Sequence, residues 1–238
     1  MDSRVTGKLQ CHYGEIMHRI AIYDMDKTIT RKSTFGPFLF YAVPRHQPWR
    51  LIFAPLLFFT ILAFVLRWID RAQLKVINLE LMLGKRIRRT ELDRLSEGFA
   101  GRTLANNVLK GALDRIASDR AEGYRIVMAT ASYRFYVTHI ARLLGIADVI
   151  ATETTELAEE IAPAIQGENC YGDAKLATVE LWLNAQGIKR EDAHIRFYSD
   201  HVTDAPCLGW ANEGYATNPH EPLRQLAKER DWTVFDWR

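Results

Sequence analysis

The chain has 238 residues, of which 48% are hydrophobic and 25% charged, and its formal net charge is +2. This is the composition of an ordinary globular protein, with room for one large domain and an insertion. The three cysteines, Cys11, Cys170 and Cys207, form no CxxC pair, so neither a zinc site nor a disulfide framework is indicated.

Residues 1–17 contain acidic side chains and no long apolar run, so we expect a poorly ordered lead-in and not a signal peptide. Arg19–Tyr23 is a short apolar run, typical of a buried parallel strand. Two carboxylates, Asp24 and Asp26, follow directly. Ligands of open α/β sheets bind at this end of a strand. One carboxylate could attack a phosphorus atom there while the other transfers protons.

After the first strand the pattern changes to helices alone. Apolar residues recur at helical spacing in three stretches, at residues 71–83, 91–99 and 104–116. A run of helices between the first strand and the next one predicts a helical cap inserted into the core. We therefore expect a catalytic core of residues 18–33 and 116–238, and a cap of residues 34–115.

The cap contains an uncharged segment, residues 51–66, that reads LIFAPLLFFTILAFVL. Sixteen residues fall short of the roughly 20 that span a bilayer as a helix, and Pro55 would kink or restart the helix. The segment is flanked by arginines and tryptophans, namely Arg45, Trp49, Arg50, Arg67, Trp68 and Arg71. Such flanks favour a helix or shallow hairpin seated at a membrane interface. The alternative is a buried cap helix, although a small cap has little interior for one.

Charge is distributed unevenly along the chain. Residues 27–115 carry 16 Lys and Arg against 6 Asp and Glu, whereas the remainder carries 15 against 23. An excess of one sign in a contiguous insert indicates a surface that meets something anionic. A solvated helical face would have the same composition, so both interpretations stay open.

The second half alternates strands with helices. We expect strands at residues 124–129, 147–151, 195–198, 214–216 and 233–235. We expect helices at residues 133–144, 174–186, 205–211 and 221–230. This alternation predicts βαβ units and a parallel sheet.

Four further polar residues stand at predicted strand ends or helix starts: Thr130, Lys175, Asp200 and Asp204. Asp24 and Asp200 would give Mg²⁺ the hard oxygen ligands that it prefers. Lys175 would place a positive charge against phosphoryl oxygens, and Thr130 would add a hydroxyl donor beside backbone N–H groups. Asp24, ionised at neutral pH, would attack directly. Asp26 would protonate the leaving oxygen and later take a proton from water.

This order of motifs, Asp24-x-Asp26-x-Thr28 followed by Thr130, Lys175, Asp200 and Asp204, resembles the haloacid dehalogenase superfamily. The resemblance runs from about Arg19 to Arg238 and is to subfamily IB, the branch that contains phosphoserine phosphatase. It implies a Rossmann-like α/β core, with a parallel sheet, helices on both faces and a helical cap inserted after the first strand. It also implies an aspartyl-phosphate intermediate and Mg²⁺.

The resemblance also implies the role of each site residue. The catalytic residues would be Asp24 as nucleophile and Asp26 as general acid and base. The residues that bind the substrate phosphate would be Thr130, Ala131 and Lys175. The metal ligands would be Asp24, Asp26 and Asp200, and the supporting residues would be Thr28, Ser132 and Asp204.

Asp26 favours phosphomonoester hydrolysis, because a dehalogenase in this superfamily need not protonate an alkoxide leaving group. Phosphoserine phosphatases place a glutamate shortly after the first motif, but this chain has no Asp or Glu between Asp26 and Asp70. That departure counts against phosphoserine as the substrate. The sequence Ser33–Leu39 and the apolar cap segment look more like a phosphatidylglycerophosphate phosphatase of the bacterial inner membrane.

Three hypotheses follow. The first is a phosphatase acting on a lipid phosphate, such as phosphatidylglycerophosphate, with the basic, apolar cap on an anionic membrane surface. The second is a soluble small-metabolite phosphatase whose apolar cap helix is buried. The third is a non-catalytic, membrane-associated regulatory protein, against which the intact motif set argues. We expect no nucleic-acid partner and a cytoplasmic location, with the cap as the part that reaches the cytoplasmic face of the inner membrane.

Overall fold

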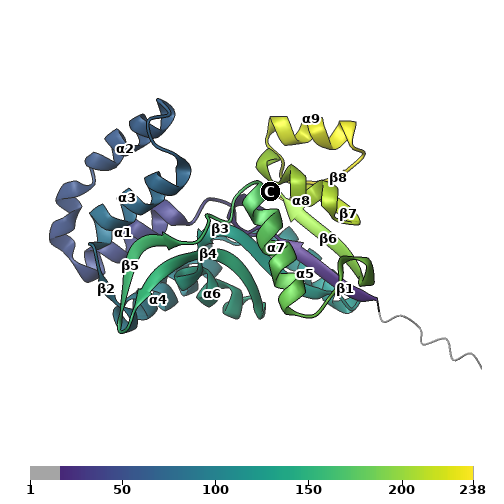
Figure 1. The fold of residues 1–238 in the computed structure, drawn as a ribbon, viewed down its shortest axis with the longest axis horizontal. Coiled ribbons are helices and arrows are strands. Elements are labelled where there is room, and N and C mark those ends of the chain that lie inside the picture. Colours follow the sequence, from purple (N-terminus) through teal and green to yellow (C-terminus); the bar gives the residue numbers. More distant parts are fainter. Residues whose placement is uncertain (1–16, 238) are drawn as a thin grey trace, which may run out of the picture.

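The computed structural model describes residues 17–237, so the lead-in predicted for residues 1–17 lies outside the described residues except for Met17. The strands are β1 (His18–Tyr23), β2 (Ile87–Arg88), β3 (Arg125–Tyr133), β4 (Asp148–Leu157), β5 (Glu160–Gln166), β6 (Ala193–Ser199), β7 (Glu213–Thr217) and β8 (Thr233–Phe235). They form one sheet in the order β2-β5-β4-β3-β1-β6-β7-β8 (Figure 1).

The α-helices are α1 (Phe35–His46), α2 (Leu56–Val65), α3 (Arg71–Leu83), α4 (Arg89–Asn107), α5 (Lys110–Ala121), α6 (Arg134–Leu143), α7 (Asp173–Ala185), α8 (Ala205–Trp210) and α9 (Glu221–Glu229). The short turns of other helix types are η1 (Met25–Ile29), η2 (Pro48–Phe53), η3 (Arg190–Asp192) and η4 (Val202–Asp204). Figure 1 shows α1, α2 and α3 at one end of the sheet and α8 and α9 at the other.

The two faces of β1 explain why helices cover both sides of the sheet. Successive side chains of a strand point to opposite faces. Ala21 and Tyr23 belong to a core cluster with residues of α1, α3, α4, α5 and α6. Ile20 and Ile22 belong to a second cluster, with residues of α7, α8 and α9. The apolar run is thus buried on both faces, and the predicted α/β fold is confirmed.

The centre of the sheet is parallel, as predicted. β1 pairs with β3 on one side and with β6 on the other, both in parallel. Parallel neighbours bring their carboxyl ends to the same edge, which is where the residues after β1, β3 and β6 meet. The backbone N–H of Asp24 donates to the carbonyl of Tyr198 (2.9 Å), which fixes the end of β1 against β6.

The sheet is mixed, however, because a hairpin extends it beyond the prediction. β4 continues past residue 151 to Leu157 and pairs antiparallel with β5, which pairs antiparallel with β2. The sequence prediction missed β5, where Pro163 interrupts the strand pattern. Proline within a run argues against a central strand, since it cannot donate to the ladder. α3 packs on β5 of this hairpin.

One predicted helix boundary was wrong. We expected a break between residues 99 and 104, but α4 runs unbroken from Arg89 to Asn107 and the break lies at Val108 and Leu109. Two glycines, Gly98 and Gly101, interrupt the apolar spacing there. A side chain at Gly98 would collide with the Tyr41 hydroxyl of α1, so this contact explains a glycine in the middle of the helix despite its weak helix propensity.

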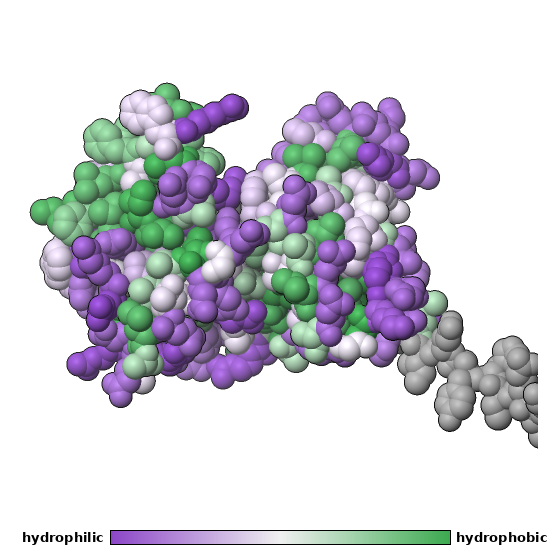
Figure 2. All heavy atoms as spheres, viewed as in Figure 1, coloured by the Kyte–Doolittle hydropathy of each residue, from purple (hydrophilic) through white to green (hydrophobic). Residues whose placement is uncertain are grey.

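The apolar segment of residues 51–66 folds as η2, a turn at Pro55, and α2. α2 contributes no buried residue, so the alternative of a buried cap helix is not what the structure has. Ile52 is 74% exposed and Phe58 65%, and Figure 2 shows hydrophobic residues gathered on the surface over α2. Within residues 17–237, no helix is both long enough and apolar enough to cross a membrane.

Candidate active site

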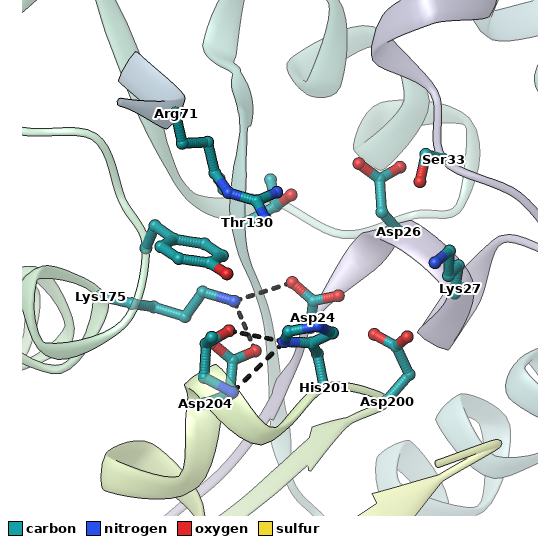
Figure 3. Close-up of a pocket in the computed structure, with 13 residues that line it drawn as sticks. Asp24, Asp26, Lys27, Ser33, Arg71, Thr130, Lys175, Asp200, His201 and Asp204 are labelled. Atoms are coloured by element: carbon teal, nitrogen blue, oxygen red, sulfur yellow. Dashed lines mark hydrogen bonds and ion pairs between the residues drawn. The ribbon is translucent and has the colours of Figure 1, made fainter. Parts of the chain in front are cut away.

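Seven of the predicted site residues line one cavity of about 200 Å³ at the carboxyl edge of the central strands (Figure 3). These residues are Asp24, Asp26, Thr130, Ala131, Lys175, Asp200 and Asp204. Thr28 and Ser132 lie nearby, but they do not line the cavity. The parallel pairing of β1, β3 and β6 therefore gathers residues that are up to 180 positions apart in the sequence.

A buried ion-pair network occupies the floor of the cavity. The ammonium of Lys175, which is 2% exposed, donates to Asp24 Oδ1 (2.8 Å) and to Asp204 Oδ2 (2.7 Å). Ser199 Oγ donates to the same Asp204 oxygen (2.7 Å). Burial opposes the charge on Lys175, but Asp204 and Asp24 outweigh it and raise the pKa of the ammonium well above its usual range. Lys175 is therefore charged at any physiological pH.

The charged groups around Asp24 are mostly negative, and the positive charge of Lys175 compensates only part of them. Burial raises the pKa of Asp24 to about 8; Lys175 opposes this rise, while the charges of Asp204 and Asp200 add to it. Burial also raises the pKa of Asp200, to about 6. Without a bound cation, the Asp24 carboxyl would therefore be largely protonated at neutral pH, contrary to the expectation from the sequence that it is ionised. A cation beside Asp24 and Asp200 would lower this pKa and restore the carboxylate.

This donor set fits Mg²⁺. No described residue donates a hydrogen bond to the Asp200 carboxylate, and Asp24 has one oxygen turned away from its bond to Lys175. Among residues 17–237, no three carboxylate, imidazole or thiol groups form a ready-made metal cage. Mg²⁺ does not require one, because it is usually held by one or two carboxylates, several waters and substrate phosphate oxygens. Asp24 and Asp200 are the residues that would hold it.

Asp26 lies in a different environment from Asp24, although only Met25 separates them. Its Oδ1 accepts from the backbone N–H (2.9 Å) and the hydroxyl (2.8 Å) of Thr34, and its Oδ2 accepts from Ser132 Oγ (2.9 Å). Burial raises the pKa of Asp26 and these hydrogen bonds oppose the rise. In Figure 3 its carboxyl group is turned toward Ser33 and away from Asp200. Both oxygens already have protein donors, so a metal-ligand role for this side chain stays a prediction.

Hydrogen bonds hold the backbone after residue 129 in place. Thr130 remains within β3, which continues to Tyr133 with a shift in register after Thr130. The Thr130 hydroxyl accepts from the backbone N–H of Ser132 (3.1 Å). The carbonyl of Ala131 accepts from Lys75 Nζ (2.6 Å) and from Thr152 Oγ1 (2.8 Å). The bulge thus presents Thr130 to the cavity while its neighbours are fixed in place.

Thr28 and Ser132, the two predicted supporting residues outside the cavity, differ in their contacts. Ser132 holds Asp26, as described above. Thr28 is fully buried, and its hydroxyl has no hydrogen-bond partner among the described residues.

Sequence reasoning missed two cations of α3, Arg71 and Lys75. Arg71 lines the cavity. Lys75 is buried and also donates to Asn169 Oδ1 (2.8 Å), which ties α3 to the loop between β5 and α7. The two residues stand one helical turn apart and so share a face. That spacing was the only signal in the sequence, and it is common in surface helices.

The chain is similar to several known proteins. A family model described as haloacid dehalogenase-like hydrolase matches residues 21–209. A Mycobacterium tuberculosis (strain H37Rv) protein named phosphoserine phosphatase SerB1 is 26% identical over 148 residues, 62% of this chain and 47% of that protein. A probable phosphatase of the same strain is 31% identical over 134 residues, 55% of this chain and 44% of that protein. The chain spans about half the length of these curated relatives.

Two solved structures show the shared fold. A protein of unknown function from Bordetella pertussis Tohama I matches with a TM-score of 0.82 and 23% identity, over 93% of this chain and 100% of that one. A phosphoserine phosphatase bearing a phospho-aspartyl intermediate analogue matches with a TM-score of 0.60 and 14% identity, over 93% and 94% of the two chains.

Proposed function

This chain belongs to the haloacid dehalogenase-like hydrolases, and we propose that it is a phosphomonoester hydrolase in which Asp24 is the nucleophile and Asp26 the general acid and base. The observation that carries this proposal is the contrast between two carboxylates at one cavity. Asp24 is paired with a buried ammonium, whereas Asp26 is surrounded by neutral hydroxyl and N–H donors. Different environments for neighbouring carboxyl groups separate nucleophile from proton donor.

The reaction has two displacements. An Asp24 oxygen attacks phosphorus, the bond from phosphorus to the leaving oxygen breaks, and Asp26 gives its proton to that oxygen. Asp26 then takes a proton from the water that attacks the aspartyl-phosphate, and the bond from phosphorus to Asp24 breaks. Thr130 and Lys175 orient the phosphoryl oxygens. Mg²⁺, held by Asp24 and Asp200, would supply charge neutralisation at the nucleophile and the phosphoryl group when bound.

A raised pKa suits Asp26 both as the acid that protonates the leaving oxygen and as the base that takes a proton from water. A general acid works best when its pKa lies close to the operating pH, and burial shifts Asp26 in that direction. Thr34, which precedes α1, and Ser132, near the end of β3, both donate to the carboxyl group, and their hydroxyl oxygens lie 3.4 Å apart. Proton transfer would therefore depend on the contact between cap and core.

The test is Mg²⁺-dependent phosphate release from a generic aryl phosphate. Asp24→Asn should abolish the release, and Asp26→Asn should reduce it by roughly 10²- to 10⁴-fold, the usual contribution of general acid–base catalysis. Asp114→Asn is the matched control, since Asp114 is an exposed carboxylate on α5 that pairs only with Lys110. Unchanged activity in Asp24→Asn would contradict the mechanism.

For the substrate we infer a lipid phosphate, such as phosphatidylglycerophosphate, with the cap on an anionic membrane. The support is an exposed apolar surface that we call the apolar tip. It consists of the exposed apolar residues of η2, including Trp49, those of α2, and Trp68. No acidic residue occurs between Asp26 and Asp70, so the tip has basic flanks only. A basic and apolar surface matches an anionic lipid interface.

The alternative is a soluble small-metabolite phosphatase, which the name of the SerB1 relative favours. Flotation with vesicles of anionic phospholipid separates the two, because the lipid-acting enzyme should rise with the vesicles. The double variant Phe58→Ser/Phe59→Ser should stay in the dense fraction. Leu181→Ser, which removes an equally exposed apolar side chain from α7, should float like the wild type. Wild-type protein that remains in the dense fraction would favour the soluble enzyme.

A further inference from the structure

Lys75 of α3 is a buried lysine that the proposed reaction does not use. It is only 7% exposed, and it does not line the catalytic cavity. Lysine is rarely buried, because removing an ammonium from water is costly. Burial accordingly lowers the pKa of Lys75 to about 7. Its amine is held instead by oxygen atoms of β3, of β4 and of the loop before α7.

The amine of Lys75 replaces a partner that the sheet does not provide. The pairing of β3 with β4 shifts in register between Thr130 and Tyr133, so Ala131 lies in a bulge. A bulge interrupts the ladder of hydrogen bonds, and a buried carbonyl there needs another donor. The Ala131 carbonyl accepts from Lys75 Nζ (2.6 Å) and from Thr152 Oγ1 (2.8 Å). A side chain of α3 thus fixes one carbonyl of the bulge.

Fixing this carbonyl also orients the hydroxyl of Thr130. The C=O of Ala131 and the N–H of Ser132 belong to one trans peptide, so they point in opposite directions. With the carbonyl held by Lys75, the Ser132 N–H points to the other side and donates to Thr130 Oγ1 (3.1 Å). The proton of the Thr130 hydroxyl has no acceptor among the described residues. Because Thr130 lines the cavity (Figure 3), that proton is available to a phosphoryl oxygen.

We propose that Lys75 is a positioning residue for phosphate binding, which holds the peptide after Ala131 so that Thr130 is oriented as a donor to the phosphoryl group. The inference rests on the phosphomonoester hydrolysis proposed above. The hydrogen bonds run from the amine through the peptide and the Thr130 hydroxyl to the phosphoryl oxygen, and bonds in such a chain strengthen one another. A neutral amine still carries N–H donors, so the role does not require the lysine to be charged.

The test is a double-mutant cycle on the affinity for inorganic phosphate, measured by calorimetry on the full chain with Mg²⁺. Lys75→Met removes the donors and keeps the length of the side chain. It should weaken phosphate binding by about 3- to 10-fold, the effect of one lost hydrogen bond. Thr130→Val, which removes the donor to phosphate itself, should weaken it by about 10- to 100-fold. In the Thr130→Val background, Lys75→Met should add less than about twofold, because its effect passes through Thr130.

A purely structural role of Lys75 predicts a different result. Lys75→Met would then weaken phosphate binding by the same factor with and without the Thr130 hydroxyl. Asn78→Ala is the matched control, because Asn78 is an equally buried polar residue of α3 that accepts from Thr60 Oγ1 (2.7 Å) of α2. It should lower the urea midpoint and change phosphate affinity by less than about twofold. Lys75→Gln, which retains N–H donors on a shorter side chain, should lose less affinity than Lys75→Met.

Equal losses from Lys75→Met in the two backgrounds would overturn the proposal. Unchanged phosphate affinity in Lys75→Met would overturn it as well, and so would a wild type that binds no phosphate. Turnover of an aryl phosphate by the wild type tests the proposed function separately. If the wild type hydrolyses the ester and the cycle is additive, only this inference fails. If the wild type does not hydrolyse the ester, the proposed function fails, and the cycle still decides whether Lys75 positions a phosphate-binding hydroxyl.

Discussion

Lys175→Met should destabilise the protein as well as inactivate it. The ammonium lies between Asp24 (2.8 Å) and Asp204 (2.7 Å), whose side chains are only 9% and 3% exposed. Removing it leaves two buried carboxylates without a cation. Breaking a buried pair in this way typically costs about 3–5 kcal/mol, because the remaining charge is uncompensated. Methionine has a similar length, so little of the cost should come from lost packing.

Urea unfolding at pH 7.5 measures this cost, and aryl phosphate turnover measures the loss of activity, which we expect to be about 10²- to 10³-fold. Asp204→Asn in the Lys175→Met background should recover part of the stability, since it removes one of the stranded charges. Lys110→Met is the matched control. Its ammonium is 84% exposed and pairs with Asp114, and pairs of that kind contribute about 0–1 kcal/mol. A cost for Lys175→Met as small as that of Lys110→Met would refute the reasoning.

Three further predictions concern pH, packing and metal. Burial lowers the pKa of Lys75 to about 7, whereas the pKa of a lysine in the unfolded chain is about 10.4. Between these two pH values the unfolded chain binds a proton at Lys75 that the folded protein has lost. The free energy of unfolding of the wild type should therefore rise with pH across this window, relative to that of Lys75→Gln. Equal pH slopes in the two urea-unfolding series would count against this. Gly214→Ala should cost about 1–3 kcal/mol, since its Cβ would lie 2.7 Å from the Leu208 carbonyl, whereas Gly101→Ala meets open space and should be neutral or stabilising. Similar melting temperatures for the two variants would argue against it. EDTA should abolish phosphate release and added Mg²⁺ restore it; turnover that survives chelation would exclude the metal role of Asp24 and Asp200.

The sequence predicted the central fold because the signals that specify it are local. The apolar run before Asp24 is buried on both faces, as a continuous apolar strand should be. Parallel strands that alternate with helices bring their carboxyl ends together, so Thr130, Lys175 and Asp200 reach one cavity. Their catalytic roles, and the division into core and cap, stay predictions.

The β4–β5 hairpin and the course of α4 were not predictable from local pattern. Pro163 obscures the strand signal of β5, and Gly98 and Gly101 obscure the continuity of α4. The glycine at position 98 is explained only by the packing of α1, a contact between segments that are distant in sequence.

By itself, the sequence determined the parallel core, the two carboxylates after β1 and the order of the polar residues that join them. These features depend on hydrophobic periodicity and on the residues at strand ends, which are local properties of the sequence. Only the tertiary structure decided that Asp26 is held by Thr34 and Ser132, that α2 exposes its apolar surface, and that Arg71 lines the catalytic cavity. These features depend on contacts, or on missing contacts, between segments that are far apart in the chain. A one-dimensional pattern does not specify which of its polar and apolar groups will find partners.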